Sequence, residues 1–280
     1  MISRRDFLKA AGITVIAAHV PSWLTNVNPT AAPTFDVLYG RVLRPLKQVW
    51  VDSIISITDI HADAFQTAHG WIDRSWVQPM LTPPVYHTAV YDPPFAAEVT
   101  GTVATMHRYC SPDAIIEHPR RVRIGHGGVL RVIDRLEYDG IAWYGVQQAD
   151  DTQVYWTQSP PLAPLIPPPT VPDLSIHVSR DDFRLTAFQR DRALFSVLLA
   201  AGESLPAGQF SVTEHLLGKR FLDQFEASTL LTFGDDLHIG GAYWHNRFGE
   251  NTPGHAIQLP PYVAKWLYGA ASIGTPVMIA

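Results

Sequence analysis

The sequence has a single cysteine, Cys110, among its 280 residues. One cysteine cannot form an internal disulfide, so a disulfide framework is excluded as the basis of the fold. Charged residues are also few, at 17%, and the formal net charge is -5. Lysine and arginine form no cluster beyond the extreme N-terminus, which argues against nucleic acid as a partner.

Apolar runs long enough to cross a membrane comfortably are missing as well. The short apolar run Ala10–Val20 follows Ser3–Lys9, which matches the full twin-arginine export signature. Residues 1–32 are therefore predicted to be a twin-arginine signal and spacer, with an ordinary amphipathic helix as the alternative. We expect export to the periplasm, the cell wall or the outer face of the cytoplasmic membrane. An uncleaved signal would act as a membrane anchor.

What the sequence does have is 46% hydrophobic residues, 23 prolines and 19 glycines. This composition predicts a packed core built from short strands and many turns, a mostly β fold class. Residues 35–82 contain β-branched and aromatic segments, including Val49–Val51 and Ile54–Ile57, which favour strands. Gly70–Ile72 and Trp76–Pro79 resemble the last strands of a bacterial SH3-like barrel.

Residues 84–158 are predicted to form a second SH3-like β unit, with a single irregular β-rich domain for both segments as the alternative. Strands are expected at Ala97–Met106, Gly128–Leu136 and Ile141–Gln147, and Asp139-Gly140 is a strong hairpin signal. The next segment, residues 159–172, holds seven prolines in fourteen residues and is predicted to be a polyproline-II linker. A proline-rich ligand for an SH3 domain is the alternative.

Residues 173–280 carry the most specific pattern. Alternating or apolar strands are expected at Leu174–Val178, Phe183–Phe188 and Ala193–Ala200. The block Ile239–Ile279 resembles the catalytic end of the L,D-transpeptidase (YkuD-type) family. The matching residues are Tyr243, Trp244, His245, Asn246, Phe248, Gly249, Ile257, Leu259, Ala264, Lys265, Trp266, Leu267 and Gly274–Val277. The resemblance runs in the correct order from Leu174 to Ile279 and implies a β-sandwich with a short helix.

The same resemblance implies acyl transfer on peptidoglycan stem peptides, with a cysteine nucleophile activated by a histidine. In this sequence the histidine slot falls on Gly240 and the cysteine slot on Ala256. The two slots are 16 positions apart, as in the family, so no gap is needed to align them. Because neither side chain can act as nucleophile or base, we predict a pseudoenzyme that binds peptidoglycan, its stem peptides or an envelope protein. No cofactor is expected.

Five residues near the slots are candidates for ligand binding: Tyr243, Trp244, His245, His255 and His238. Core packing is the alternative for the aromatic residues. A metal-dependent hydrolase built on the three histidines is a further alternative, but the segment has no H-x-x-x-H or acidic ligand spacing, and no metal site is assigned. An active transpeptidase or carboxypeptidase with a displaced catalytic group would need Cys110, the only thiol.

Overall fold

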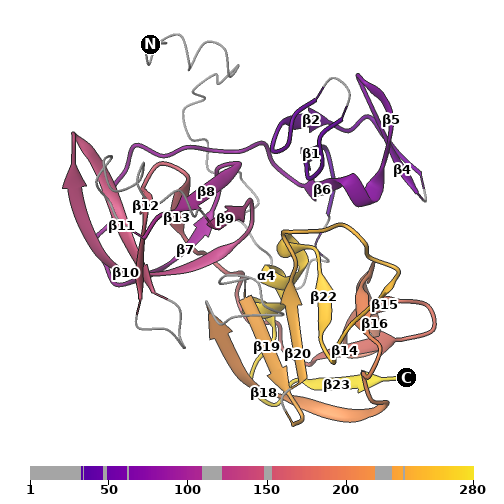
Figure 1. Cartoon of the computed structure of the whole chain (residues 1–280). Coiled ribbons are helices and arrows are strands. Elements are labelled where there is room, and N and C mark those ends of the chain that lie inside the picture. The colour runs from indigo at the N-terminus through magenta and orange to yellow at the C-terminus, as the bar shows by residue number, and fades with distance from the viewer. Residues whose placement is uncertain are drawn as a thin grey trace.

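The computed structural model describes residues 33, 35–46, 49–61, 63–108, 122–147, 153–217, 229–235 and 237–280. The predicted export segment and Cys110 lie outside the described residues. Within these ranges almost all the regular elements are β-strands, and one α-helix lies near the C-terminal end (Figure 1). The mostly β fold class with a short helix is therefore confirmed. No helix in the described part of the chain is both long and apolar enough to cross a membrane.

The N-terminal unit (residues 35–82) contains two three-stranded sheets and a short 3-10 helix. Their elements are β1 (Tyr39–Val42), β2 (Ile54–Ser56), β3 (Asp59–Ile60), β4 (Ala64–Thr67), β5 (Gly70–Asp73), η1 (Arg74–Trp76) and β6 (Val77–Met80). Strand β1 lies between β2 and β6 and is antiparallel to both. The buried side chains of Val42, Phe65, Ile72 and Val77 form the centre of its core.

The strand expected at Val49–Val51 is wrong, because this segment is part of a turn. The Ser53 N–H donates to the Trp50 carbonyl at 3.1 Å, and Asp52 has a φ of 64°. Aspartate tolerates this left-handed conformation better than most residues. The turn directs the Asp52 carboxylate toward Arg41 of β1, a contact that no strand propensity could indicate.

The middle unit (residues 84–164) contains a five-stranded antiparallel sheet in the order β12-β11-β10-β7-β13 and a separate pair, β8 with β9. The strands are β7 (Phe95–Val99), β8 (Val103–Met106), β9 (Val122–Gly125), β10 (Val129–Tyr138), β11 (Ile141–Gln147), β12 (Val154–Gln158) and β13 (Leu162–Pro164). The Asp139-Gly140 hairpin is confirmed, with both residues at positive φ and Tyr138 paired with Ile141. The SH3-like assignment of the first two units stays a prediction.

Two expectations for this unit need correction. The single strand expected at Ala97–Met106 is two strands in different sheets. The two strands are separated by a bend at Gly101, between the end of β7 and the start of β8. A Cβ added to Gly101 would lie 2.6 Å from Pro161 Cβ, so the proline-rich segment packs directly against this bend. That segment is also not a free linker throughout, since Leu162 pairs with Val99 in the sheet and the Val171 N–H donates to the Ala270 carbonyl at 2.8 Å.

The C-terminal unit (residues 171–280) is a mixed ten-stranded sheet in the order β16-β15-β14-β23-β18-β19-β20-β22-β17-β21. Its strands are β14 (Leu174–Ser179), β15 (Arg184–Gln189), β16 (Arg192–Leu198), β17 (Ala200–Gly202), β18 (Gly208–Leu217), β19 (Thr229–Phe233), β20 (Leu237–Gly241), β21 (Asn251–Thr252), β22 (Ile257–Leu259) and β23 (Pro276–Ile279). The strand expected at Ala193–Ala200 is divided between β16, at one end of this order, and β17, next to the strand at the other end. Strand β23 lies between β14 and β18, parallel to the first and antiparallel to the second.

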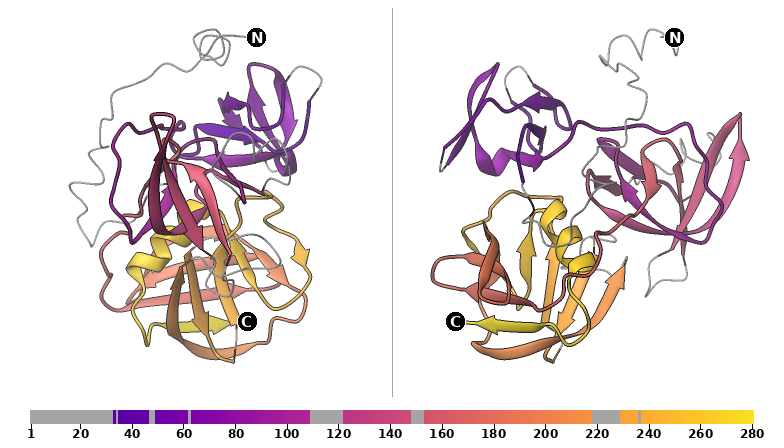
Figure 2. Two further views of the ribbon diagram at one scale, coloured as in Figure 1. Left: turned by 60° about the vertical axis from the view of Figure 1, so that its left-hand side comes forward. Right: turned by 180° about the vertical axis from the view of Figure 1, so that it is seen from behind.

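Helix α4 (Pro261–Ala270) begins with proline at its first position, where the missing N–H costs no helical hydrogen bond. Its apolar face, including Val263, Ala264 and Leu267, is buried in the core of the C-terminal unit. On another face Lys265 Nζ donates to Glu98 Oε2 of β7 at 2.5 Å. The helix therefore lies between the C-terminal sheet and the middle unit, as the views in Figure 2 also show.

Candidate functional site

Gly240 lies on β20, and Ala256 comes directly before the neighbouring strand β22. Strands β20 and β22 are parallel, and Gly240 pairs with Gln258, two positions after Ala256. On its other side Gly240 pairs with Leu230 of β19. The pairing of β20 with β22 thus brings the two slots near each other, offset by two positions in register.

The space around Ala256 is apolar and filled. Ala256 is 5% exposed and clusters with the fully buried Leu230, and the partly buried side chains of Leu216 and Trp244 pack against this pair. Acyl transfer by the family's route needs a nucleophile and a base that act together, and neither is present in the two slots.

His245 is close to the slots, but hydrogen bonds fix it as a neutral donor. Its Nδ1 accepts from the Arg247 backbone N–H at 3.0 Å, so the ring proton lies on Nε2, which donates to Gln258 Oε1. Gln258 Nε2 then donates to Thr252 Oγ1 at 3.3 Å, and that hydroxyl donates to the Ala201 carbonyl at 3.3 Å. Burial lowers the pKa of His245. Both ring nitrogens are therefore engaged, which leaves no lone pair for a base or a metal ligand.

The other two candidate histidines have separate partners. His238 Nδ1 lies 3.3 Å from Thr232 Oγ1 on the adjacent strand, and the exposed His255 has Nδ1 3.4 Å from the Ser204 carbonyl. Within the described ranges, no three histidine, cysteine, aspartate or glutamate side chains gather into a group that could hold a metal ion.

The ring of Tyr243 is buried, although the residue is a candidate for ligand binding. Its side chain is 4% exposed and belongs to the apolar core of the middle unit, with Ile124 and Leu130 in the same cluster. This burial favours the core-packing alternative for Tyr243. Trp244 differs, because its half-buried indole both packs against the Ala256 cluster and faces an open pocket.

That pocket has a volume of about 450 Å³ and lies where the N-terminal and C-terminal units meet. The C-terminal unit contributes Trp244, His245, Arg247, Thr252, Pro253 and Gln258. The N-terminal unit contributes Leu43, Arg44 and Ser75. None of the described residues that line it is acidic. Of the sequence candidates, only Trp244 and His245 line this pocket, and neither arginine carries a local motif by which it could have been found.

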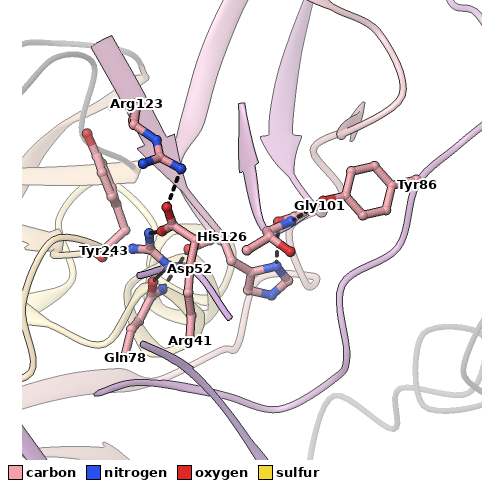
Figure 3. Close-up of polar contacts among 9 residues, drawn as sticks. Arg41, Asp52, Gln78, Tyr86, Gly101, Arg123, His126 and Tyr243 are labelled. Carbon is pink, nitrogen blue, oxygen red and sulfur yellow. Dashed lines mark hydrogen bonds and ion pairs between the residues drawn. The ribbon is translucent and has the colours of Figure 1, made fainter. Parts of the chain in front are cut away.

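The units are joined beside this pocket by the buried guanidinium of Arg41 (Figure 3). Arg41 Nη2 donates to the Tyr243 carbonyl at 2.6 Å, Nη1 to Asp52 Oδ1 at 2.7 Å, and Nε to Gln78 Oε1 at 2.7 Å. Asp52 also forms an ion pair with Arg123 of the middle unit. We call these five residues the junction, because they connect all three units.

The junction extends further into the middle unit through the side-chain amide of Gln78. Gln78 Nε2 donates to the His126 carbonyl at 2.7 Å. His126 Nδ1 lies 3.2 Å from the Thr100 and Gly101 carbonyls, so this nitrogen carries a proton. Burial lowers the pKa of His126, while nearby Glu98 and these carbonyls oppose the shift. The ring is thus held neutral by its surroundings.

No family model and no curated protein matches this sequence. Among solved structures, an Enterococcus faecium L,D-transpeptidase mutant is 20% identical, with a TM-score of 0.33 over 39% of this chain and 50% of that chain. The chain thus spans about half the length of that protein. L,D-transpeptidase 3 from Mycobacterium tuberculosis is 16% identical, with a TM-score of 0.36 over 49% of this chain and 78% of that one. Similarity at this level does not establish a shared activity.

Proposed function

We propose that this chain is an exported, non-catalytic protein of the cell envelope that binds peptidoglycan stem peptides through its L,D-transpeptidase-like C-terminal unit. The proposal of export comes from the twin-arginine signature, and that of the ligand class from the ordered motifs between Leu174 and Ile279. An envelope protein is the alternative partner of the same surface.

One observation carries the absence of catalysis. Ala256 is buried against Leu230 and Trp244, directly beside the strand that carries Gly240. A displaced catalytic group would need an open route to this point, whereas apolar side chains occupy it. The one nearby histidine that lines the pocket, His245, is held as a neutral donor. The retained pocket beside Trp244 supports binding, because it stays open while the slots are filled.

The test combines an acylation probe, a turnover assay and a binding assay on the full chain. A carbapenem acylates the cysteine of active relatives, so we expect no covalent adduct by intact-mass spectrometry. Muropeptide turnover should be zero for wild type and equally zero for Cys110→Ala. The protein should sediment with isolated sacculi. A stoichiometric carbapenem adduct near Gly240 and Ala256 would refute the non-catalytic proposal. Muropeptide turnover by wild type that is lost in Cys110→Ala would also refute it. Failure to sediment with sacculi would refute peptidoglycan binding.

A further inference from the structure

The pocket between the N-terminal and C-terminal units has two cationic side chains in its wall. Arg44 comes from the segment after β1, and Arg247 from the loop between β20 and β21. Trp244, Leu43 and Pro253 supply apolar surface in the same wall. Guanidinium groups recognise carboxylates through paired N–H donors, and indole and aliphatic surface accommodates an apolar body.

The other polar groups of the wall are engaged with one another or with the backbone. His245, Gln258 and Thr252 form the hydrogen-bond chain that ends at the Ala201 carbonyl. Ser75 donates both its N–H and its hydroxyl to Asp73 Oδ1, at 2.8 and 2.7 Å. Recognition of an anionic ligand is therefore left to the two arginines.

Two carboxylates of the chain compete for these arginines, and both are weak competitors. Glu250 Oε2 lies 3.7 Å from Arg247 Nε, and both side chains are about half exposed, so this ion pair contributes little. Asp73 interacts electrostatically with Arg44, but its Oδ1 is the acceptor for Ser75, whose hydrogen bonds are the main cause of its lowered pKa. A ligand carboxylate could replace Glu250 beside Arg247 at little cost.

Two hydrogen bonds between the units hold the pocket walls in place. Arg41, three residues before Arg44, donates to the carbonyl of Tyr243, the neighbour of Trp244. Asn246, between His245 and Arg247, donates through Nδ2 to the Arg74 carbonyl at 2.9 Å, next to Ser75. Each contact thus lies within two residues of pocket-lining residues on both sides. The N-terminal unit is docked where its arginine completes the pocket.

We propose that this composite pocket binds the C-terminal carboxylate of a peptide between Arg44 and Arg247, with the adjoining apolar side chain against Trp244. The inference deepens the proposed function, because it names the part of a stem peptide that would be recognised and assigns half of the cationic wall to the N-terminal unit.

The experiment is a calorimetric titration of the full chain with an N-acetylated trialanine peptide that ends in D-alanine, as the free acid and as the C-terminal amide. The acid should bind at least about tenfold more tightly than the amide, since hydrogen bonds to charged groups are the stronger ones. Arg44→Gln and Arg247→Gln should each lower the affinity for the acid about tenfold and reduce the difference between acid and amide. Arg44→Lys, which keeps the charge, should recover part of the loss.

Arg131→Gln is the matched control, because Arg131 is an exposed arginine of β10 that does not line the pocket. Near-ultraviolet circular dichroism establishes that each variant is folded. Equal affinity for acid and amide, no binding of the acid, or the same loss in Arg131→Gln would overturn the inference. Sacculus sedimentation separates the two proposals. If sacculi bind but acid and amide do not differ, only the carboxylate site fails, and if the acid binds but sacculi do not, only peptidoglycan binding fails.

Discussion

Replacing Arg41 with methionine should loosen the contact between the N-terminal unit and the rest of the molecule. Methionine is also an unbranched side chain, but it cannot make the three hydrogen bonds that the buried guanidinium donates. Gln78 Oε1 and the Tyr243 carbonyl would lose their donor, and Asp52 would keep only Arg123, whose side chain is 55% exposed.

The expected magnitude follows from this geometry. Removing one member of a buried ion pair costs about 3–5 kcal/mol, because the other charge stays buried without its partner. The exposed Arg123 continues to compensate Asp52, which lowers the cost, while the two orphaned acceptors raise it by about 1–3 kcal/mol each. We therefore expect a loss of about 4 kcal/mol. At about 2–4 °C per kcal/mol, the Tm should fall by roughly 8–16 °C.

Thermal unfolding followed by circular dichroism measures this effect for wild type, Arg41→Met, Asp52→Asn and the double variant. The double-mutant cycle should give a coupling energy of about 0.5–3 kcal/mol, the range for residues in one hydrogen-bond or salt-bridge network. Arg131→Met, at an exposed site, should stay within about 0.5 kcal/mol of wild type. A Tm for Arg41→Met within about 2 °C of wild type, or a coupling energy near zero, would place the junction among ordinary surface ion pairs and refute this reasoning.

Three further predictions concern other contacts between elements. Burial lowers the pKa of His126, so below pH 6.5 the unfolded state binds more protons than the folded state. The stability that is present above pH 6.5 is therefore lost as the pH falls. In urea titrations at several pH values, His126→Asn should flatten this dependence of stability on pH by up to about 1.4 kcal/mol per pH unit. Gly269→Ala should destabilise the protein by about 1–3 kcal/mol, because its Cβ would lie 2.3 Å from the Pro168 carbonyl oxygen, and an unchanged or raised Tm would contradict this packing. In a double-mutant cycle, Lys265→Met and Glu98→Gln should show a coupling energy above the roughly 0.2–1 kcal/mol of exposed ion pairs. The reason is that the two side chains are only 21% and 17% exposed. A smaller coupling energy would count against a buried ion pair.

Local signals in the sequence predicted those parts of the fold that local contacts determine. Asp139-Gly140 predicted its hairpin because both residues accept positive φ, as the turn requires. The alternating pattern at Leu174–Val178 predicted β14, in which every second residue is buried. Val49–Val51 has strand propensity but forms part of a turn, because Asp52 is needed beside Arg41. Propensity carries no information about that partner.

The site shows the same division between local and distant contacts. The spacing of the motifs located Gly240 and Ala256, and the strand register places them together. Arg44 could not be predicted as a pocket residue, because it reaches the pocket through contacts between units, such as that of Arg41 with Tyr243, about two hundred residues away in sequence. Tyr243 was singled out by its motif, yet the middle unit covers its ring. Motifs therefore identified the strands of the site but not which units would enclose it.

The central position of β23 determines the order in which the C-terminal unit can assemble. Strands β14, β15 and β16 pair with their neighbours in sequence, as do β18, β19 and β20. Among the described residues, only β23 joins these two groups, by pairing with β14 from the opposite end of the unit. Contacts so distant in sequence form late, because a long loop must close first. A chain interrupted before Pro276 would therefore expose two open sheet edges, which are templates for aggregation.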